Sequence, residues 1–338
     1  MLVKKQLPFY LIFGIPLVLL LTCLFLTTRL PFESQPFIFS NAIIADLLLT
    51  IPLVYYLLIR KTAIPKLTIV PVFVLGILLA SKFIPVENQQ YLQIIITYVF
   101  PLVELGVFIF LTINLYKLIK EFRRNKLRYQ DFYDNLKQSA STILPNKISQ
   151  LFATEISVLF YSFIHWKKES LSINEYSYHK NSGSVGLFLG LLLIITIELS
   201  VLHVLLAKWS ETFAWVLTAL SIYSAIQIIG FLKSIMKRPI ILKGESLILR
   251  YGILSETIVS LHDIKKVVLS SKELEEGSDV VFLSPLGKLE SHNIIIQLKN
   301  TNIVNRLYGL RKNYTSIAFY VDNPENFFFQ LEENRKAL

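Results

Sequence analysis

The chain has 338 residues, of which 53% are hydrophobic and 17% are charged, and its formal net charge is +10 at pH 7. Soluble domains contain about 25% charged residues, so this composition excludes an ordinary soluble protein and favours one embedded in a bilayer. A single cysteine, Cys23, excludes a disulfide framework and a metal site built from cysteines.

Six long apolar runs follow one another along the chain. They begin near Leu7, Phe37, Leu67, Tyr91, Val185 and Thr212. Each is close to the roughly 20 residues with which an α-helix crosses about 30 Å of hydrocarbon. No small-x-small cleavage site follows the first run, so we interpret it as a retained signal anchor. The predicted fold class is therefore an α-helical polytopic membrane bundle with six transmembrane helices.

Positive charge in the gaps between the runs predicts the orientation. Lys4 and Lys5 precede the first run, and Lys and Arg are also numerous after the second, fourth and sixth runs. The intervening gaps carry only Arg29, Lys82 and Lys208. By the positive-inside rule, this alternation places both termini in the cytoplasm. Most of the positive charge then lies near anionic headgroups, so we expect membrane lipids as partners and no nucleic acid.

The basic segment 120–184, between the fourth and fifth runs, is too long for a tight turn. Apolar residues recur at helical spacing from Lys147 to Lys168, and Trp166 is followed directly by Lys167. An aromatic ring beside lysines is typical of the membrane interface. Two interpretations stay open. Either the helix lies in the plane of the bilayer, or it packs on its neighbours and covers the cytoplasmic ends of the bundle.

After residue 236 the hydrophobic period changes to that of β-strands. Leu247 and Leu249 begin an alternation of period two, and similar short runs follow between glycines. Near the end, Asn323 followed by Pro324 indicates the start of a helix. Antiparallel strands followed by one helix predict a pleckstrin-homology-like (PH-like) β-barrel closed by that helix.

These patterns divide the chain into four predicted parts. They are membrane helices one to four (1–119), the cytoplasmic basic and amphipathic segment (120–184), membrane helices five and six (185–236) and the cytosolic PH-like β-domain (237–338).

Six segments carry a resemblance to a known family. They are Leu151–Trp166 (LFATEISVLFYSFIHW), Tyr178–Gly183 (YHKNSG), Glu198–His203 (ELSVLH), Ala214–Leu220 (AWVLTAL), Ser291–Leu298 (SHNIIIQL) and Phe319–Pro324 (FYVDNP). From about Lys147 onward, more than half of the chain resembles an uncharacterised family of bacterial multi-pass membrane proteins with a C-terminal bacterial PH-like domain. The resemblance implies a location in the bacterial cytoplasmic (inner) membrane. It implies no established activity.

Some members of that family are labelled β-carotene cleaving monooxygenases, whose chemistry uses four histidines on one iron in a soluble β-propeller. The five histidines of this chain are His165, His179, His203, His262 and His292. They are scattered over a loop, a membrane helix and the β-domain. We therefore expect no such iron site, no other metal and no cofactor.

Three acids lie within the apolar runs, where ionisable groups are costly and are therefore functional candidates. Asp46 lies in the second run, Glu104 in the fourth and Glu198 in the fifth, followed by His203. One interpretation is a proton or cation site, in which neighbouring carboxylates repel and at least one holds a proton. The other is that each acid is satisfied by itself and orients helix packing. Glu198 and His203 lie about 140° apart on a helix, so we expect no shared metal site, and His203 fits the outer interfacial belt.

Two groups of polar residues are candidates for binding a lipid phosphate. They are Tyr178, His179, Lys180 and Ser182 at the cytoplasmic start of the fifth run, and Arg306, Arg311 and Lys312 in the β-domain. Backbone amides and cations at a helix start can hold a phosphate. A polar entry loop and a solvated loop, respectively, are the alternatives.

Three functional hypotheses follow. The first is a non-enzymatic membrane anchor or scaffold whose PH-like domain binds lipid headgroups or a protein partner. The second is a proton- or cation-coupled transporter that uses Asp46, Glu104 and Glu198. The third is a membrane enzyme that acts on lipid near His179 or Glu198, although the sequence contains no phosphate-binding loop, nucleophile elbow or dinucleotide fingerprint.

Overall fold

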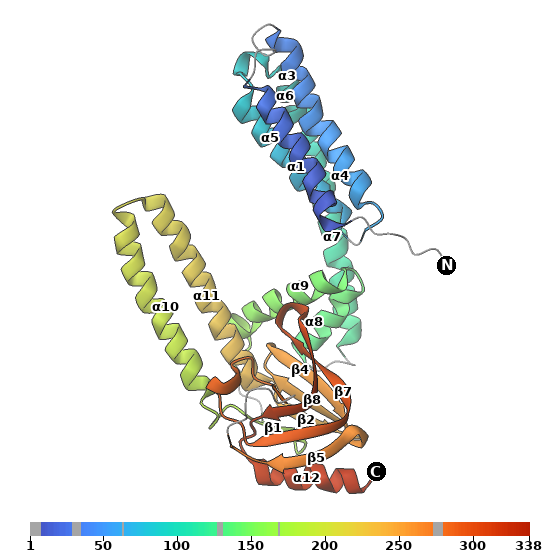
Figure 1. Ribbon diagram of the computed structural model, residues 1–338, viewed down its shortest axis with the longest axis vertical. Coiled ribbons are helices and arrows are strands. Elements are labelled where there is room, and N and C mark those ends of the chain that lie inside the picture. The colour runs from blue at the N-terminus through green and yellow to red at the C-terminus, as the bar shows by residue number, and fades with distance from the viewer. Residues whose placement is uncertain (1–7, 29–34, 63, 127–130, 168–169, 273–279) are drawn as a thin grey trace. The chain divides into compact units, whose positions relative to one another are not determined.

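The computed structural model describes residues 8–28, 35–62, 64–126, 131–167, 170–272 and 280–338 (Figure 1). The charges Lys4, Lys5 and Arg29, used above to predict the orientation, lie outside the described residues. The chain divides into two units, Met1–Ile119 and Lys120–Leu338.

Six helices among the described residues are long and apolar enough to cross a membrane. They are α1 (Phe9–Leu26), α3 to α4 (Pro36–Ile59), η2 to α5 (Lys66–Phe83), α6 to α7 (Gln90–Asn125), α10 (Ser184–Ala207) and α11 (Glu211–Lys237). Each begins within about two residues of its predicted start. The prediction of six long apolar helices is confirmed.

Two of these helices widen into a π-helical turn next to a proline. The turn η1 (Asp46–Thr50) ends shortly before Pro52, and η4 (Ile95–Val99) ends shortly before Pro101. Proline has no amide hydrogen, and its ring clashes with the carbonyl one turn earlier. A wider turn relieves that clash, so each helix continues through its proline.

The core of the first unit lies where α1, η1, α5 (Ile69–Phe83) and α6 (Gln90–Ile94) meet. Its members include Ile43, Leu47, Ala80 and Leu92, all of which are buried. The helix α7 (Phe100–Asn125) differs, because none of its residues is buried among the described parts of the chain.

The second unit combines a helical hairpin, shorter helices and a sheet. The helices α10 and α11 form the hairpin, and α9 (Asn146–Leu159) lies across the end of α11 that is nearer the sheet (Figure 1). The helix α8 (Phe132–Ser141) packs on α9, and the π-helical turn η5 (Phe160–Ile164) extends α9. The helix predicted from Lys147 is thus confirmed, while its predicted end at Lys168 lies outside the described residues.

The strands of the second unit form one mixed sheet. They are β1 (Glu175–Tyr176), β2 (Ile240–Lys243), β3 (Ser246–Tyr251), β4 (Ser255–Ser260), β5 (Ile264–Leu269), β6 (Val280–Phe282), β7 (Ile294–Arg306) and β8 (Arg311–Phe319). Their order is β1-β2-β3-β4-β7-β8-β6, and β5 also pairs with β7. The strand β6 runs parallel to β8, whereas the other pairs are antiparallel.

The predicted closed barrel is wrong, because the sheet is open. Within the described residues, β1 and β6 end the strand order and do not pair with each other. The long strand β7 explains the difference. It pairs with β5 near its start and with β4 near its end, and its register with β8 shifts between Gln297 and Asn302. The alternation of side chains predicts strands, but it does not predict such a change of partner.

The predicted C-terminal helix is confirmed as α12 (Pro324–Lys336). The side chain of Asn323 caps it by accepting a hydrogen bond of 3.3 Å from the amide of Asn326. Phe327 and Leu331 are fully buried, and they join the core of the sheet.

The helices α9 and α11 approach each other at backbone distance. A Cβ atom at Gly230 of α11 would lie 2.7 Å from the carbonyl oxygen of Val158 and 2.9 Å from Oγ of Ser162. Ser162 also donates a hydrogen bond of 2.9 Å to the carbonyl of Ile226. Close approach through small residues is typical of helices that pack inside a membrane.

We predict that Gly230→Ala destabilises the second unit by about 1–3 kcal/mol, because a backbone carbonyl cannot move aside as a flexible side chain can. Thermal unfolding of the purified protein in detergent measures the effect. Gly190→Ala is the matched control, since nothing lies within 4 Å of a Cβ at that position of α10. The control is expected to keep or raise stability, because alanine favours a helix more than glycine does. Equal effects of the two substitutions would contradict the close packing.

Candidate functional site

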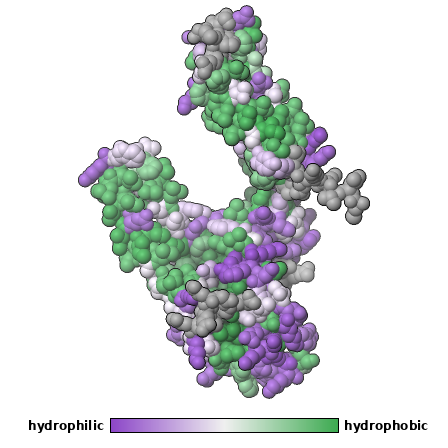
Figure 2. Space-filling view, viewed as in Figure 1, coloured by the Kyte–Doolittle hydropathy of each residue, from purple (hydrophilic) through white to green (hydrophobic). Residues whose placement is uncertain are grey.

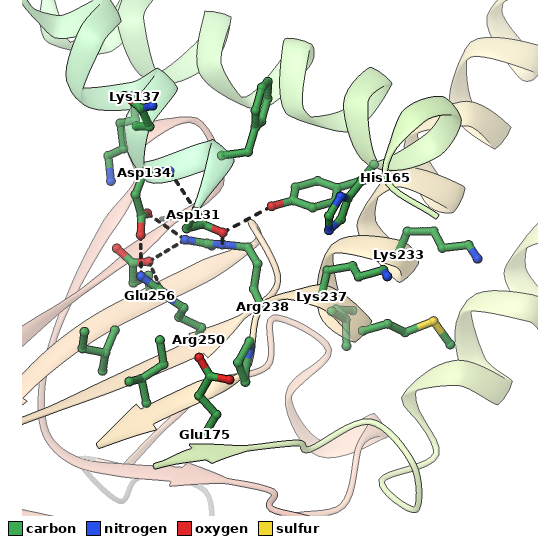
Figure 3. A pocket seen from close by; sticks show the side chains of 18 of the residues that line it. Asp131, Asp134, Lys137, His165, Glu175, Lys233, Lys237, Arg238, Arg250 and Glu256 are labelled. Carbon is green, nitrogen blue, oxygen red and sulfur yellow. Dashed lines mark hydrogen bonds and ion pairs between the residues drawn. The ribbon is translucent and has the colours of Figure 1, made fainter. Parts of the chain in front are cut away.

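The second unit contains an open cleft with a volume of about 1910 Å³ (Figure 3). Its walls come from α8, the end of η5, the segment around β1, the end of α11 and the strands β2 to β4. Figure 2 shows hydrophilic residues gathered on this sheet-bearing part of the unit, in contrast to the apolar hairpin. A cleft of this size and polarity is the main candidate for a binding site.

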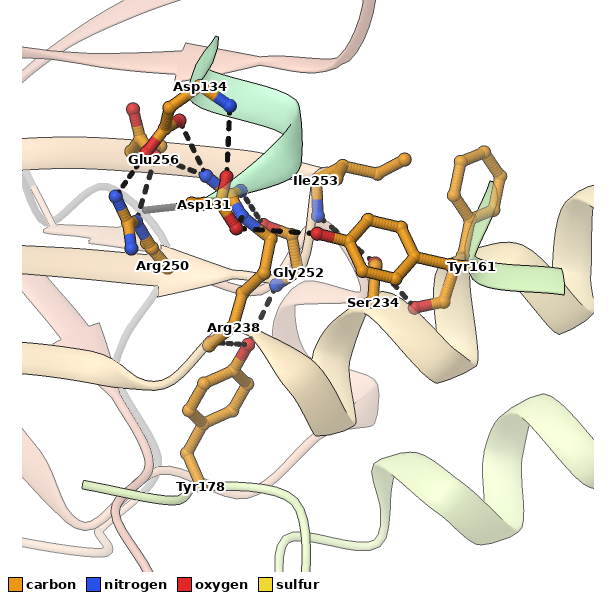
Figure 4. Close-up of polar contacts among 11 residues, drawn as sticks. Asp131, Asp134, Tyr161, Tyr178, Ser234, Arg238, Arg250, Gly252, Ile253 and Glu256 are labelled. Carbon is orange, nitrogen blue, oxygen red and sulfur yellow. Dashed lines mark hydrogen bonds and ion pairs between the residues drawn. The ribbon is translucent and has the colours of Figure 1, made fainter. Parts of the chain in front are cut away.

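A buried arginine stands at the centre of one wall. The side chain of Arg238 is 0% exposed, and its Nε lies 3.0 Å from Oδ2 of Asp131. Its Nη2 lies 2.7 Å from Oδ1 of Asp134 and 2.9 Å from Oε2 of Glu256. Its Nη1 donates to the carbonyl of Gly252 (Figure 4). Each of the three guanidinium nitrogens therefore has a partner. A lysine has a single nitrogen and could not make all of these contacts.

A second arginine completes what we call the Arg238 network, namely Asp131, Asp134, Arg238, Arg250 and Glu256. Nε of Arg250 lies 3.0 Å from Oε2 of Glu256, and its Nη2 pairs with Asp134. Three carboxylates therefore share two guanidinium groups. The network joins α8, the end of α11 and the strands β3 and β4 (Figures 3 and 4).

Local structure brings these side chains together. Asp131 caps α8 and accepts a hydrogen bond of 2.9 Å from the amide of Asp134, so both acids lie at the favourable end of the helix dipole. Arg238 directly follows α11, where the chain turns into the sheet. Gly252 makes the turn between β3 and β4 with a positive φ of 53°, and a Cβ there would lie 2.9 Å from the amide nitrogen of Ile235.

Two tyrosines connect the network to its surroundings. Tyr178 is buried, donates a hydrogen bond of 3.0 Å to the carbonyl of Arg238 and accepts one of 2.7 Å from the amide of Gly252. Tyr161 of η5 donates a hydrogen bond of 3.3 Å to Oδ2 of Asp131. Tyr178 therefore links the turn after β3 to Arg238, and Tyr161 links η5 to Asp131, a partner of the same arginine (Figure 4).

The network contains one more carboxylate than guanidinium groups, and this excess explains the pKa values of its acids. Burial opposes the charge of Asp131 and Glu256, but Arg238 and Arg250 outweigh it, and the pKa of each acid lies below its ordinary value. For Asp134, burial together with the charges of Glu256 and Asp131 outweighs the arginines and raises the pKa to about 6. One proton thus enters the network just below neutral pH.

The rest of the cleft is strongly basic. Seven further cations line it, namely Lys126, Lys137, Lys180, Lys233, Lys237, Lys243 and Arg311. Within the described part of the chain, none of them forms a salt bridge. In all, nine cationic side chains face four carboxylates across the cleft. Because the arginines of the network are already neutralised, this surplus remains available to an anionic ligand.

The predicted phosphate-binding residues are only partly brought together. Tyr178, His179, Lys180 and Arg311 line the cleft. The amides of Lys180 and Asn181 donate to Oδ1 of Asp322 at 3.0 and 3.2 Å, so a carboxylate of the protein already occupies them. Burial lowers the pKa of His179, which is therefore neutral at pH 7.

The other predicted phosphate-binding residues lie outside the lining of the cleft. Ser182 is buried beside Ser184, which donates to the carboxylate of Glu290. Arg306 donates a hydrogen bond of 3.0 Å to the carbonyl of Phe282, and Lys312 is exposed on β8.

The acids of the membrane helices are also outside the cleft. Asp46 lies in η1 and Glu104 in α7, both in the first unit, whereas Glu198 lies in α10 of the second unit. Glu104 and Glu198 are exposed and form no salt bridge with another described residue. His203 joins α10 to α11, since its Nδ1 lies 2.8 Å from Oγ1 of Thr218.

No pattern in the sequence predicted the Arg238 network. Asp131 and Asp134, with the spacing of a helix cap, were the available signal. Arg238 was counted only as one of the positive charges after the sixth run, because nothing in its neighbourhood along the chain shows that it is buried. Its carboxylate partners on α8 are more than 100 positions away in the sequence.

Comparisons with known proteins found no matching family model, no matching curated protein and no matching solved structure. Among the described residues, no group of three or more His, Cys, Asp or Glu side chains is placed to hold a metal ion. The chemistry of the cleft itself is therefore the basis for a functional proposal.

We predict that Arg238→Ala destabilises the second unit by about 3–5 kcal/mol, because it leaves buried carboxylates without their cation. Arg238→Lys is expected to restore only part of the lost stability, because one ammonium group cannot make all the directed contacts of the planar guanidinium group. Arg124→Ala, which removes an ion pair between an exposed arginine and the partly buried Glu121, is the control and should change stability by less than about 1 kcal/mol. Thermal unfolding in detergent compares the three variants, and similar losses for Arg238→Ala and Arg124→Ala would refute the role of the network.

The network also predicts a pH dependence of stability. In the unfolded chain an Asp titrates near about 3.9, so between that pH and about 6 the folded protein binds one more proton at Asp134. Stability is therefore expected to rise as the pH falls from 7 towards 5. It then declines as the pH falls below about 4, because Asp131 and Glu256 become protonated and lose their pairing with the arginines.

Asp134→Asn is the variant that tests this assignment, because it keeps the shape of the side chain and removes its titration. Thermal unfolding from about pH 7.5 to about pH 4.5, which brackets the titration at about 6, should show no rise in stability for this variant as the pH falls. A rise equal to that of the wild type would mean that another group takes up the proton.

Proposed function

We propose that this protein is a non-enzymatic anchor in the bacterial cytoplasmic membrane, with both termini in the cytoplasm, whose second unit binds anionic lipid headgroups in the basic cleft. The observation that carries the proposal is the surplus of cations along the cleft, where nine cationic side chains face four carboxylates. A phosphate or other anionic headgroup is the chemistry that such a surplus recognises.

The position of the cleft beside α11 supports a lipid as the source of the anion. At about 1.5 Å per residue, α11 is longer than the roughly 30 Å of hydrocarbon that it would cross, so its last turns extend beyond the hydrocarbon. These turns carry Lys233 and Lys237, and both line the cleft. Nζ of Lys233 lies 3.8 Å from the centroid of the Trp166 ring, an arrangement typical of headgroup depth.

The architecture of the sheet domain agrees with a lipid-binding module. Its strands are followed by the single helix α12, which is the order of elements in the PH-like domain that the sequence resembles, although the sheet is open. The Arg238 network ties this domain to α11, because Arg238 directly follows that helix and pairs with Glu256 of the sheet. Such a protein would hold its cytosolic domain at the membrane surface.

The transporter and lipid-enzyme hypotheses stay separate predictions. The contacts of Asp46, Glu104 and Glu198 give the transporter hypothesis no specific support. The contacts of His179 and Glu198 give none to the lipid-enzyme hypothesis. The cleft is therefore the better basis for a first experiment.

We predict that replacing Lys233, Lys237 and Lys243 together by Gln weakens binding of phosphatidylglycerol at least about tenfold, since each lysine near an anionic surface contributes about 1 kcal/mol. Native mass spectrometry of the purified full-length protein, titrated with phosphatidylglycerol or phosphatidylcholine, measures it. The control replaces Lys265, Lys266 and Lys336 of β5 and α12 by Gln. It makes the same change of charge on the side of the sheet away from α11 (Figure 1).

Two outcomes would contradict the proposal. Equal losses for the two variants would show that only total charge matters. Equal binding of phosphatidylglycerol and phosphatidylcholine by the wild type would show that the cleft does not select anionic lipid. Competition with glycerol phosphate identifies the source of the anion, because full displacement at equal concentration would point to a soluble phosphate compound.

A further inference from the structure

The helix α9 and its extension η5 carry a large apolar surface that no part of the described chain covers. We call this surface the outer face, and its members are Leu151 (47% exposed), Leu159 (44%), Phe163 (64%), Ile164 (71%) and Trp166 (58%), which follows η5. A monomer in water rarely leaves so many large apolar side chains together at its surface.

The opposite face of the same helix is buried and built mainly from small side chains. Its members are Ser149, Ala153, Thr154, Ser157 and Ser162, together with Val158 and Tyr161, and all are at most 3% exposed. Ser149, Ala153 and Ser157 are spaced four residues apart, so they form one line along the helix.

This arrangement is the reverse of that in a helix on a soluble domain. Such a helix buries its large apolar residues and exposes its polar ones. In a bilayer, helices pack through small residues and turn their large apolar residues towards lipid. The helix α9 follows the second pattern, because Gly230 of α11 approaches Val158 and Ser162 at backbone distance.

The outer face is continuous with the surface of a membrane-spanning helix. The crossing with α11 lies near Ile226 and Gly230, and one to two turns earlier in α11 Ile222 and Tyr223 are exposed to 48% and 44%. The Trp166 indole donates a hydrogen bond of 2.8 Å to the carbonyl of Ser162 and lies beneath Lys233. The outer face thus adjoins the apolar surface of α11, close to the pair of Trp166 and Lys233.

The tip of the β7–β8 hairpin lies against α9 and adds residues of the same kind. The hydroxyl of Tyr308 donates a hydrogen bond of 3.0 Å to Glu155, and Leu310 beside it is 67% exposed. Arg311 and Lys312 follow directly. Apolar residues flanked by cations suit the boundary between acyl chains and headgroups.

We propose that α9 and η5 lie in the plane of the bilayer, with the outer face in contact with lipid acyl chains just below the headgroups. The sequence left two interpretations open, a helix in the plane of the bilayer and a helix packed on its neighbours. They apply to opposite faces of α9. The inner face packs on α8 and α11, and the outer face contacts lipid. This contact is apolar, so it does not depend on the anionic headgroups of the proposed function.

A fluorescent probe at single positions tests the proposal in the full-length protein. In a Cys23→Ser background, which has no other cysteine, Leu159→Cys and Phe163→Cys are labelled with NBD, and Glu325→Cys on α12 is the matched control. The side chains of Leu159 and Phe163 are exposed, so their replacement leaves the packing of the helix intact. Vesicles of phosphatidylcholine alone separate this test from headgroup binding.

Doxyl-labelled lipid is expected to quench the probes at 159 and 163 several-fold more strongly than the probe at 325, and aqueous iodide is expected to show the opposite order. Strong quenching of 159 and 163 by iodide would overturn the proposal, because the face would then lie in water. Protection from both quenchers would overturn it equally, because another protein surface would then cover the face. An unchanged thermal unfolding curve confirms that each labelled variant is folded.

Discussion

The second unit depends on one buried guanidinium shared by three carboxylates. Burying Arg238 costs desolvation free energy, and that cost is offset only by several close carboxylates in fixed positions. Asp131 and Asp134 come from the start of α8, and Glu256 comes from β4. Because the arginine itself follows α11 directly, the same contacts hold together the long apolar helix α11, the shorter helix α8 and the sheet. An element that shifted alone would leave a buried charge unpaired.

The network also explains why the cleft is basic although many acids lie near it. Its carboxylates are occupied by Arg238 and Arg250, so they do not neutralise the lysines of the rim. Two of those lysines, Lys233 and Lys237, belong to the end of the long apolar helix α11, and under the proposed function this end lies at the headgroups. The Arg238 network in the wall of the cleft is buried and internally paired, whereas the lysines along the cleft carry the surplus of positive charge. This combination suits a site that selects charge rather than one exact ligand shape.

Local patterns predicted much of the fold, and contacts between distant residues account for the rest. The six apolar helices and the helix after Asn323 follow from hydropathy and capping, which are readable along the chain. The closed barrel was wrong because β7 changes partner along its length, and no local pattern encodes which strands meet. The Arg238 network was missed because burial of an arginine at the end of a long apolar helix depends on acids about 100 positions away. Lys180 and Arg311 were predicted as headgroup residues and do line the cleft, whereas Arg306 and Lys312 do not.

The basic cleft is proposed to hold an anionic headgroup at the membrane surface. A cryo-electron-microscopy structure of the full-length protein in nanodiscs that contain phosphatidylglycerol tests it most directly. The account predicts density for a phosphate within hydrogen-bonding distance of Lys233 or Lys237, with the Arg238 network intact behind it. An empty cleft that opens away from the bilayer, in the presence of that lipid, would contradict the account.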